Sequence, residues 1–304
     1  MKVVALAGGT GSAKLLRGLA STKCDLTVVS NVGDNVWMHG LYVCPDIDIA
    51  MYTLAGIADA KRGWGIEGDT FTTLGQLGSL GRETWFALGD RDLATHILRT
   101  AAIRGGKTLT QATEDLCRDF GVRARILPAT NSPLETRIFT HEGEMGLQEF
   151  WVRRKGRPWA TGVGYRGAES AKVTAEVEER VLEADVVVVC PANPITSIGP
   201  LLAVRGLEEC LARAGAKVAA LSPMAGRAAF SGPAAKLMKA CGVRPDSLGV
   251  ASLYLGFVDA MVIDLEDENM APRIRALGVR CRPSDTRLES AASERRLAEE
   301  LLAA

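Results

Sequence analysis

Residues 2–16 read KVVALAGGTGSAKLL, in which an apolar run passes through a glycine-rich turn into a helical segment. A continuous apolar run of this length is typical of a strand that is buried on both faces of a parallel sheet. Glycines in the turn let the backbone approach a ligand closely, and the N-terminus of the following helix favours a phosphate group. The stretch predicts the first β-α unit of a parallel sheet, with a candidate anion site where strand and helix meet.

The same alternation of apolar runs with helical segments recurs towards both ends of the chain. Apolar runs bounded by Gly, Pro or Asp predict strands at residues 3–7, 26–30, 186–190, 217–221, 260–263 and 279–282. Apolar spacing predicts helices at residues 13–21, 93–103, 109–120, 201–214, 234–241 and 286–302. Repeated β-α units indicate an α/β fold with a Rossmann-like, doubly wound, mostly parallel sheet.

The middle of the chain departs from this alternation. Residues 49–120 show mostly helical spacing that glycines interrupt. Residues 126–165 hold Thr-, Ile-, Phe- and Trp-containing segments around a Glu142-Gly143 turn, which favours a hairpin over another β-α unit. We therefore predict a smaller α+β insert at residues 121–170, between the first part of the core at 1–120 and its second part at 171–304.

Composition and charge exclude several classes of protein. The 304 residues are 47% hydrophobic and 24% charged, which is ordinary for a globular enzyme and excludes a disordered or fibrous chain. Lys and Arg number 36, as do Asp and Glu, so no bulk charge attracts nucleic acid or an anionic membrane. The 7 cysteines are scattered without a C-x-x-C pair. We expect a cytoplasmic protein with reduced thiols that binds neither nucleic acid nor a membrane.

The GGTG turn at residues 8–11 differs from the two common phosphate-binding fingerprints. It matches neither G-x-x-x-x-G-K-[ST] nor G-x-G-x-x-G, so an ordinary NTPase and a nicotinamide-dependent dehydrogenase both lose support. A tight strand-to-helix turn without a ligand is the alternative interpretation. The candidate substrate-binding residues of this turn are Gly8, Gly9, Thr10, Gly11 and Lys14.

A polar stretch, NVGDNVWMHGLYVCPDID, follows the second predicted strand at residues 31–48. Open α/β sheets bind ligands beyond the carboxyl ends of their strands. Asp46 and Asp48, together with Asp34, offer hard oxygen ligands that suit Mg²⁺ bridged to substrate phosphates. Alternatively, one residue of the Asp46 and Asp48 pair caps the helical run that follows, and both interpretations stay open. Further candidate substrate-binding residues here are Asn31, Asp34 and Trp37.

The motif GDRD at residues 89–92 precedes a predicted helix that contains His96. A guanidinium group pairs with phosphate or carboxylate through two parallel hydrogen bonds, so Arg91 is a candidate anion clamp. Asp90 beside it is a candidate binding residue. We interpret His96, like the other two histidines, as a packed or capped side chain. The residues predict no Ser-His-Asp or Cys-His nucleophile.

Loops after two later strands complete the predicted crevice. The loop PANPITSIGP occupies residues 191–200, LSP ends the next strand at 221–223, and SGP opens a helix at 231–233. Because the carboxyl ends of parallel strands share one edge of a sheet, we expect these loops and the GGTG turn to form one nucleotide crevice. Its further candidate substrate-binding residues are Asn193, Pro194, Ser197, Gly199, Ser222 and Gly232.

Taken in chain order, six motifs resemble the 2-phospholactate transferase family of coenzyme F-420 biosynthesis. They are GGTGSAKLL, NVGDNVWMHGLYVCPDID, KRGWGIEGDTF, LGDRDLATHILR, NPITSIGP and SGPAAKLM. The resemblance implies a Mg²⁺-dependent enzyme that transfers the phosphate-bearing acid of a guanosine diphospho-acid to the terminal ribityl hydroxyl of the deazaflavin FO, releasing GMP. The implied acid is 2-phospholactate or its phosphoenolpyruvyl analogue, and the implied assembly is a homodimer.

Carried onto this sequence, the resemblance places Asp48 near the attacking hydroxyl of FO, with Asp46 beside it as a second candidate metal ligand. Together with Arg91 these are the candidate catalytic residues. A position where the family has an FO-contacting lysine falls on Ala87, so that contact is not carried over. The strongest alternative is a related group of regulatory proteins that bind nucleotide sugars on a similar core. The P-D-x-D and GDRD motifs favour the enzyme.

Overall fold

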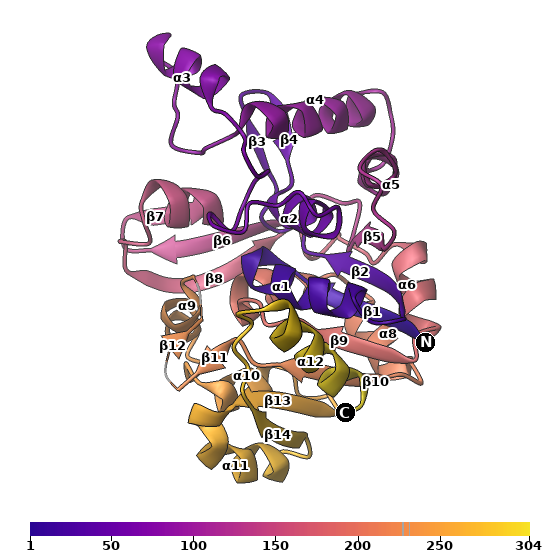
Figure 1. Ribbon diagram of the computed structural model, residues 1–304. Coiled ribbons are helices and arrows are strands. Elements are labelled where there is room, and N and C mark those ends of the chain that lie inside the picture. The colour runs from indigo at the N-terminus through magenta and orange to yellow at the C-terminus, as the bar shows by residue number, and fades with distance from the viewer. Residues whose placement is uncertain (227, 231) are drawn as a thin grey trace.

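A seven-stranded parallel sheet forms the centre of the computed structural model, which describes residues 1–226, 228–230 and 232–304 (Figure 1). The strand order is β14-β13-β10-β9-β1-β2-β5, and each neighbouring pair is parallel. The strands are β1 (Lys2–Ala7), β2 (Asp25–Ser30), β5 (Arg125–Pro128), β9 (Val186–Val189), β10 (Lys217–Leu221), β13 (Ala260–Asp264) and β14 (Arg280–Ser284). The predicted α/β class and Rossmann-like sheet are confirmed.

Strand β1 marks the point where the order of the sheet reverses. The chain runs outward through β2 and β5 on one side, and through β9, β10, β13 and β14 on the other. Ala7 lies beside Ser30 of β2, and Leu6 lies beside Val189 of β9, so the carboxyl ends of these three strands are nearly level. Open sheets bind their ligands at such a reversal.

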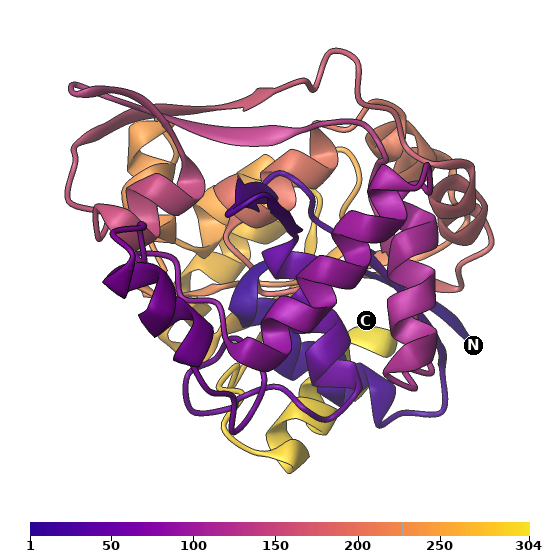
Figure 2. The same cartoon turned by 90° about the horizontal axis from the view of Figure 1, so that it is seen from above.

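Helices cover both faces of the sheet. Helix α1 (Gly9–Ala20) packs against α12 (Ala291–Leu302) and α2 (Pro45–Leu54) on one face, whereas α6 (Ala175–Leu182) and α8 (Leu207–Arg213) pack together on the other (Figures 1 and 2). The remaining helical segments of this half are η2 (Pro194–Ile198), α7 (Gly199–Leu202), α9 (Ala234–Ala240), α10 (Ser247–Leu253), η3 (Leu265–Met270) and α11 (Ala271–Ala276). The valines of β9 are buried, as expected for a strand covered on both faces.

The predicted hairpin around Glu142-Gly143 is confirmed. It joins β6 (Glu135–Thr140) to β7 (Gly143–Gly146), and β8 (Ala160–Arg166) pairs with the other edge of β6 in an antiparallel sheet. A short π-helical segment, η1 (Glu149–Arg153), connects β7 to β8. Strand β5 also falls within residues 121–170, yet it pairs with β2 in the main sheet. The division into domains at these boundaries stays a prediction.

Residues 31–48 fold into a hairpin and a helix start. Strands β3 (Val36–Met38) and β4 (Leu41–Val43) are joined by His39 and Gly40, whose φ angles of 51° and 78° suit a two-residue hairpin turn. Helix α2 begins at Pro45, so Asp46 and Asp48 lie in its first turn. The interpretation of one of them as a helix cap is wrong, because Cys44 is the N-cap residue and makes no side-chain capping bond.

The segment between α2 and β5 is helical, as its spacing predicts. It contains α3 (Thr72–Ser79), α4 (Asp90–Arg104) and α5 (Leu109–Asp119), and α3 lies apart from the sheet (Figures 1 and 2). The predicted helix at 201–214 is two helices, because Gly206 between them has a φ of 94°. Among the described residues, none of the helices combines the length and apolar character that crossing a membrane requires.

Candidate active site

A cavity of about 690 Å³ opens at the carboxyl edge of the main sheet, where the strand order reverses. Its lining includes the β1–α1 turn, the start of α2, the loop after β9, residues 230 and 232–234, and residues 286–289. Aromatic side chains from the middle of the chain complete the wall, among them Trp64, Trp85 and Trp151. Its volume lies within the range typical of small-molecule sites.

Many of the residues predicted from the sequence meet in this lining. They are Gly8, Gly9, Thr10, Gly11, Lys14, Asp34, Asp46, Asp48, Asn193, Ser197 and Gly232. The expected convergence of the loops therefore occurs, whereas the function of each residue stays a prediction. Ser231, which belongs to the predicted SGP loop, lies outside the described residues.

Two glycines allow the start of α1 to approach its neighbours closely. A Cβ atom on Gly8 would lie 2.9 Å from the Cβ of Ser197 and 3.0 Å from Oδ2 of Asp46. A Cβ atom on Gly11 would lie 2.4 Å from the carbonyl oxygen of Pro191. These contacts are too short for a side chain, so the glycines bring the N-terminus of α1 against the loops that follow β2 and β9.

Asp46 is held by groups from two strand ends. Its Oδ1 accepts a hydrogen bond from the backbone N–H of Gly9 at 2.8 Å, and its Oδ2 accepts one from the side-chain amide of Asn31 at 2.7 Å. The same amide donates to the carbonyl of Thr196 at 3.2 Å. Asn31 is therefore a support behind the cavity wall. Burial raises the pKa of Asp46 to about 6.

Asp34 lies close enough to Asp46 for their charges to interact. Burial, followed by the negative charge of Asp46, raises the pKa of Asp34 well above its ordinary value. Among the described residues, its Oδ1 atom is buried without a hydrogen-bond partner. A buried carboxylate with an unpartnered oxygen beside a second carboxylate favours uptake of a proton or a cation.

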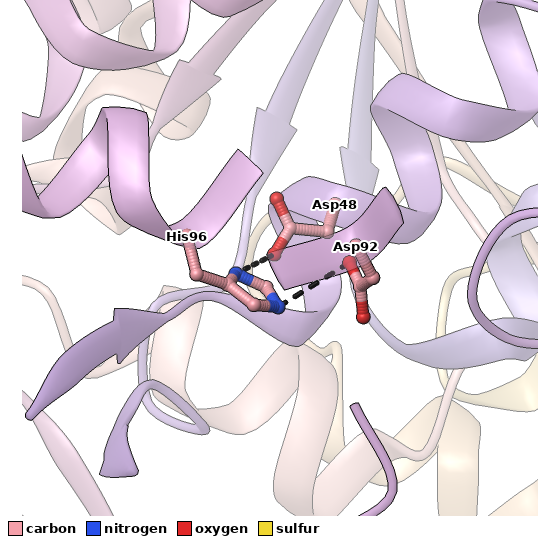
Figure 3. Close-up of side chains that lie close together, drawn as sticks. All are labelled: Asp48, Asp92 and His96. Carbon is pink, nitrogen blue, oxygen red and sulfur yellow. Dashed lines mark ion pairs between the residues drawn. The ribbon is translucent and has the colours of Figure 1, made fainter. Parts of the chain in front are cut away.

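Asp48 faces the cavity and is bound from behind by Arg99. The guanidinium of Arg99 donates to Oδ2 of Asp48 at 3.1 Å and also to Oδ1. Nδ1 of His96 lies 3.6 Å from Oδ2 of Asp48, and its Nε2 lies 3.3 Å from Oδ1 of Asp92 (Figure 3). The hydroxyl of Tyr52 donates to that Asp92 oxygen at 2.6 Å. Two carboxylates, an imidazole and a guanidinium thus form one buried network.

Neighbouring groups lower the pKa of Asp92. Burial acts to raise this pKa, but His96, Tyr52 and Arg99 together outweigh burial and leave the pKa below its ordinary value. By spacing alone, Asp48, Asp92 and His96 can hold a metal ion. The ring of His96 lies between the two carboxylates with one nitrogen facing each (Figure 3). A single ion would bind only one of those nitrogens and would meet the positive charge of Arg99.

Asp90 and Arg91 of the GDRD motif lie outside the described lining of the cavity, whereas Asp92 is part of it. Asp90 accepts hydrogen bonds from the hydroxyl of Thr70 at 2.5 Å and from the backbone N–H groups of Thr72 and Thr73, each at 2.9 Å. These bonds lower the pKa of Asp90, the Thr70 hydroxyl most of all, and hold the start of α3. Arg91 is exposed, and its guanidinium donates to the carbonyl of Glu67 at 2.9 Å. Its role as an anion clamp stays a prediction.

Four other predicted residues also lie outside the described lining. Trp37 is 53% exposed on β3 and packs against Tyr42. Ser222 is buried, and its hydroxyl lies 2.8 Å from that of Ser247. Pro194 is buried in η2, and a Cβ on Gly199 would lie 2.0 Å from the Tyr165 hydroxyl. The contacts of these residues support neighbouring loops.

Sequence reasoning missed most of the buried network and much of the aromatic wall. Arg99 occupies a helix interior, where a basic residue ordinarily faces solvent, so no local pattern marks it. His96 is buried, as a packed histidine would be, but it packs between two carboxylates. Trp64 could be singled out from the sequence, because glycines flank it in the segment KRGWG at residues 61–65.

The chain matches, over residues 3–293, the family described as 2-phospho-L-lactate transferase CofD. It is 44% identical over 299 residues to a 2-phospho-L-lactate transferase of Methanosarcina acetivorans, covering 98% of this chain and 97% of that protein. It is 42% identical over 290 residues to a phosphoenolpyruvate transferase of Streptomyces coelicolor, covering 93% and 91%. A solved UPF0052 family protein from Bacillus halodurans shares the fold, with a TM-score of 0.65 and 18% identity, covering 99% of this chain and 98% of that protein.

Proposed function

Since the chain belongs to the 2-phospho-L-lactate transferase family, we propose that its cavity joins a guanosine diphospho-acid to the deazaflavin FO and releases GMP. The enzyme transfers 2-phospholactate or phosphoenolpyruvate in coenzyme F-420 biosynthesis, because relatives named for each acid match nearly the whole chain. Identities of 44% and 42% to the two kinds of relative do not distinguish the acids. The observation that carries the proposal is that Asp48 and the N-terminus of α1 line one cavity.

We assign the donor diphosphate to the edge formed by α1 and the loop after β9. The N-terminus of α1 offers backbone N–H groups and a positive partial charge to an anion. Lys14 lines the same edge and is exposed. Among the described residues, the side-chain nitrogen of Asn193 is buried without an acceptor, although Asn193 lines the cavity. These groups supply the hydrogen bonds and charge that a diphosphate requires.

We assign FO to the aromatic side of the cavity. Trp64, Trp85 and Trp151 offer large flat surfaces that suit a planar ring system. Asp48 lines the same cavity as these tryptophans and the glycine turn. An acceptor whose ring packs on the tryptophans can therefore bring a terminal hydroxyl towards the donor phosphorus.

In the proposed reaction, Asp48 is the catalytic base. The acceptor oxygen attacks the phosphorus that carries the acid, and a new P–O bond forms as the bond to the GMP oxygen breaks. The hydroxyl proton passes to the carboxylate of Asp48 and then to water, while GMP leaves with the bonding electron pair. Phosphoryl transfer depends mainly on positioning and charge neutralisation, so it requires no covalent intermediate with the protein.

We propose Mg²⁺ as the cofactor and Asp46 and Asp34 as the residues that would hold it. Both are acidic and both line the cavity, and Oδ1 of Asp34, which has no hydrogen-bond partner in the described part of the chain, is the hard oxygen donor that Mg²⁺ prefers. Asp48, the other ligand predicted from the sequence, fits less well because Arg99 already balances its charge. When bound, Mg²⁺ would neutralise negative charge on the phosphates.

The experiment that tests this function supplies both substrates to the purified protein. FO, Mg²⁺ and each guanosine diphospho-acid are mixed with the protein, and the products are identified by mass spectrometry. We expect GMP together with coenzyme F-420-0 or its dehydro form, and the better donor identifies the acid. Absence of product with either donor would contradict the proposal. Binding of a nucleotide sugar without transfer to FO would favour the regulatory alternative.

The homodimer and the cytoplasmic location also stay predictions. Light scattering of the purified protein at several concentrations measures its molar mass, and a mass near twice 32.3 kDa is expected.

A further inference from the structure

Arg99 is a fully buried guanidinium near the middle of α4. Its side chain is 0% exposed, and it donates to both carboxylate oxygens of Asp48. It also lies 3.5 Å from the carbonyl of Tyr42 and 3.3 Å from Nδ1 of His96. Arg99 lies outside the described lining of the cavity, whereas Asp48 is part of it. The arginine therefore contacts the carboxylate from the side away from the cavity.

Stability alone does not account for this arginine. Burying a guanidinium removes it from water, and a buried ion pair often contributes no more stability than apolar residues of similar volume. The atom Nε of Arg99, moreover, is buried without an acceptor among the described residues. If residue 99 only had to pack α4 against its neighbours, an apolar side chain would be sufficient.

The geometry of the pair fixes the carboxylate of Asp48. Two N–H groups of one planar guanidinium that donate to two oxygens of one carboxylate hold its plane as well as its position. Each carboxylate oxygen has a second lone pair, so both remain able to accept a further hydrogen bond. Arginine stays protonated in proteins, so Arg99 remains a donor to both oxygens of Asp48.

The helix that carries Arg99 is itself tied to the hairpin beside the cavity. The backbone N–H of Tyr42 in β4 donates to the hydroxyl of Thr100 at 2.8 Å. Arg99 thus connects α4, α2 and β4 at one point. Small displacements of reacting groups are costly in enzymes, because a misplacement of about 1 Å can lower the rate about 10²-fold.

We propose that Arg99 is a positioning residue, which holds the Asp48 carboxylate towards the acceptor hydroxyl. This inference rests on the proposed function, because Asp48 is the group on which it acts. Arg99 contacts neither substrate, so its removal affects turnover and leaves substrate binding unchanged.

The test uses steady-state kinetics of the full-length Arg99→Lys variant with FO and the better donor. Lysine retains the charge and loses the two-pronged geometry. We expect kcat to fall about 10²-fold and KM for each substrate to stay within about twofold of the wild-type value. A kcat equal to that of the wild type would overturn the proposal.

Arg104→Lys is the matched control. Arg104 lies in the last turn of the same helix, is exposed, and donates to the carbonyl of Gly40 at 3.0 Å. The chemical change is identical and the residue lies outside the catalytic network, so we expect wild-type kinetics.

A double-mutant comparison separates positioning from a general structural role. If Arg99 acts through Asp48, the pair Asp48→Asn and Arg99→Met together is no slower than Asp48→Asn alone. Independent structural damage predicts that the two losses multiply, and that result contradicts the proposal. The Arg99→Met variant alone leaves Asp48 buried without a counter-charge and can fail to fold. In that case Arg99→Lys and the double variant provide the test.

Crystal structures of the wild type and of Arg99→Lys give a measurement that is independent of the reaction. We expect the Asp48 carboxylate to rotate or shift in the variant. An unchanged carboxylate overturns the positioning role whichever reaction the enzyme performs. Absence of product from the wild type together with a displaced Asp48 in the variant contradicts only the proposed function.

Discussion

At the scale of residues, Asp46 and Asp48 have different surroundings although only one residue separates them. Positions two apart on a helix point to different sides, so Asp46 faces Gly9 and Asn31 while Asp48 faces Arg99. Asp46 is bound by neutral donors and Asp48 by a cation. We therefore assign them different tasks, metal binding to Asp46 and proton acceptance to Asp48.

Replacement of Asp48 by Asn removes the proposed base. We expect transfer to FO to fall about 10²–10⁴-fold, the usual contribution of a general base, while guanine nucleotide still binds. The variant also leaves Arg99 buried without a counter-charge, which destabilises a protein by about 3–5 kcal/mol, so it should melt below the wild type. Kinetics and calorimetry at a temperature where the variant is folded measure both effects. Near-normal transfer would mean that the chemistry lies elsewhere.

Asp34→Asn tests the pair of neighbouring carboxylates. Both pKa values are raised in the folded protein, that of Asp46 to about 6, so the charged forms of the two groups oppose folding. This cost disappears as pH falls towards the ordinary pKa value of 3.8. Without Mg²⁺ we expect the variant to melt higher than the wild type at pH 7, and the advantage to shrink by pH 4.

Addition of Mg²⁺ should reverse that order. The wild type should gain stability from the cation at pH 7, and Asp34→Asn should gain little. Thermal melting at pH 4 and pH 7, with and without Mg²⁺, provides the data. An equal rise in melting temperature of both proteins on addition of Mg²⁺ would show that Asp34 is not a ligand of the proposed metal site.

At the scale of elements, six of the seven strands of the main sheet were predictable because each is a short apolar run. Strand β5 was not recognised, since its four residues end in a proline and follow a long helical stretch. The β3–β4 hairpin was missed because His39, not a glycine or asparagine, begins its turn with a φ of 51°. The predicted crevice loops, by contrast, meet as expected, because parallel strands place their carboxyl ends on one edge.

The start of α1 provides a prediction at this scale. Gly11→Ala places a Cβ atom 2.4 Å from the carbonyl oxygen of Pro191 and must push helix and loop apart. We expect a loss of about 1–3 kcal/mol in the free energy of unfolding and weaker nucleotide binding. Gly75→Ala in α3 is the control, because open space surrounds that position and alanine favours a helix by about 0.5–1 kcal/mol. Chemical denaturation compares the two variants.

At the scale of the whole molecule, one cavity joins parts of the chain that are far apart in sequence. Residues 8–14, 191–197 and 286–289 supply one side, and the aromatic wall comes from the middle of the chain. Sequence motifs predicted residues 8–14 and 191–197 because each follows a strand, whereas residues 286–289 were predicted as the start of a helix that begins only at Ala291. The wall was less predictable, since it depends on how the middle of the chain folds over the sheet edge.

Trp151→Ala tests the aromatic wall. Loss of one aromatic contact is worth about 0.5–1.5 kcal/mol, so we expect KM for FO to rise about 2- to 10-fold with little change in nucleotide affinity. Trp159→Ala is the matched control, because Trp159 follows in the same connection, is 72% exposed and lies outside the described lining. Equal KM values for FO in the two variants would indicate that FO binds in another part of the cavity.

Nucleotide binding should stabilise the whole molecule, because the proposed donor site combines α1, the loop after β9 and residues 232–234. These segments are adjacent only in the folded chain, so a ligand that contacts them all binds the folded state and raises the melting temperature. At about 100 times its dissociation constant, such a ligand adds about 2.7 kcal/mol. We expect GDP to raise the melting temperature more than ADP does at the same concentration, and Gly11→Ala to reduce the shift. Equal shifts for the two nucleotides would contradict a guanosine donor, while a larger shift for GDP in the wild type alone would locate its phosphates at the glycine turn.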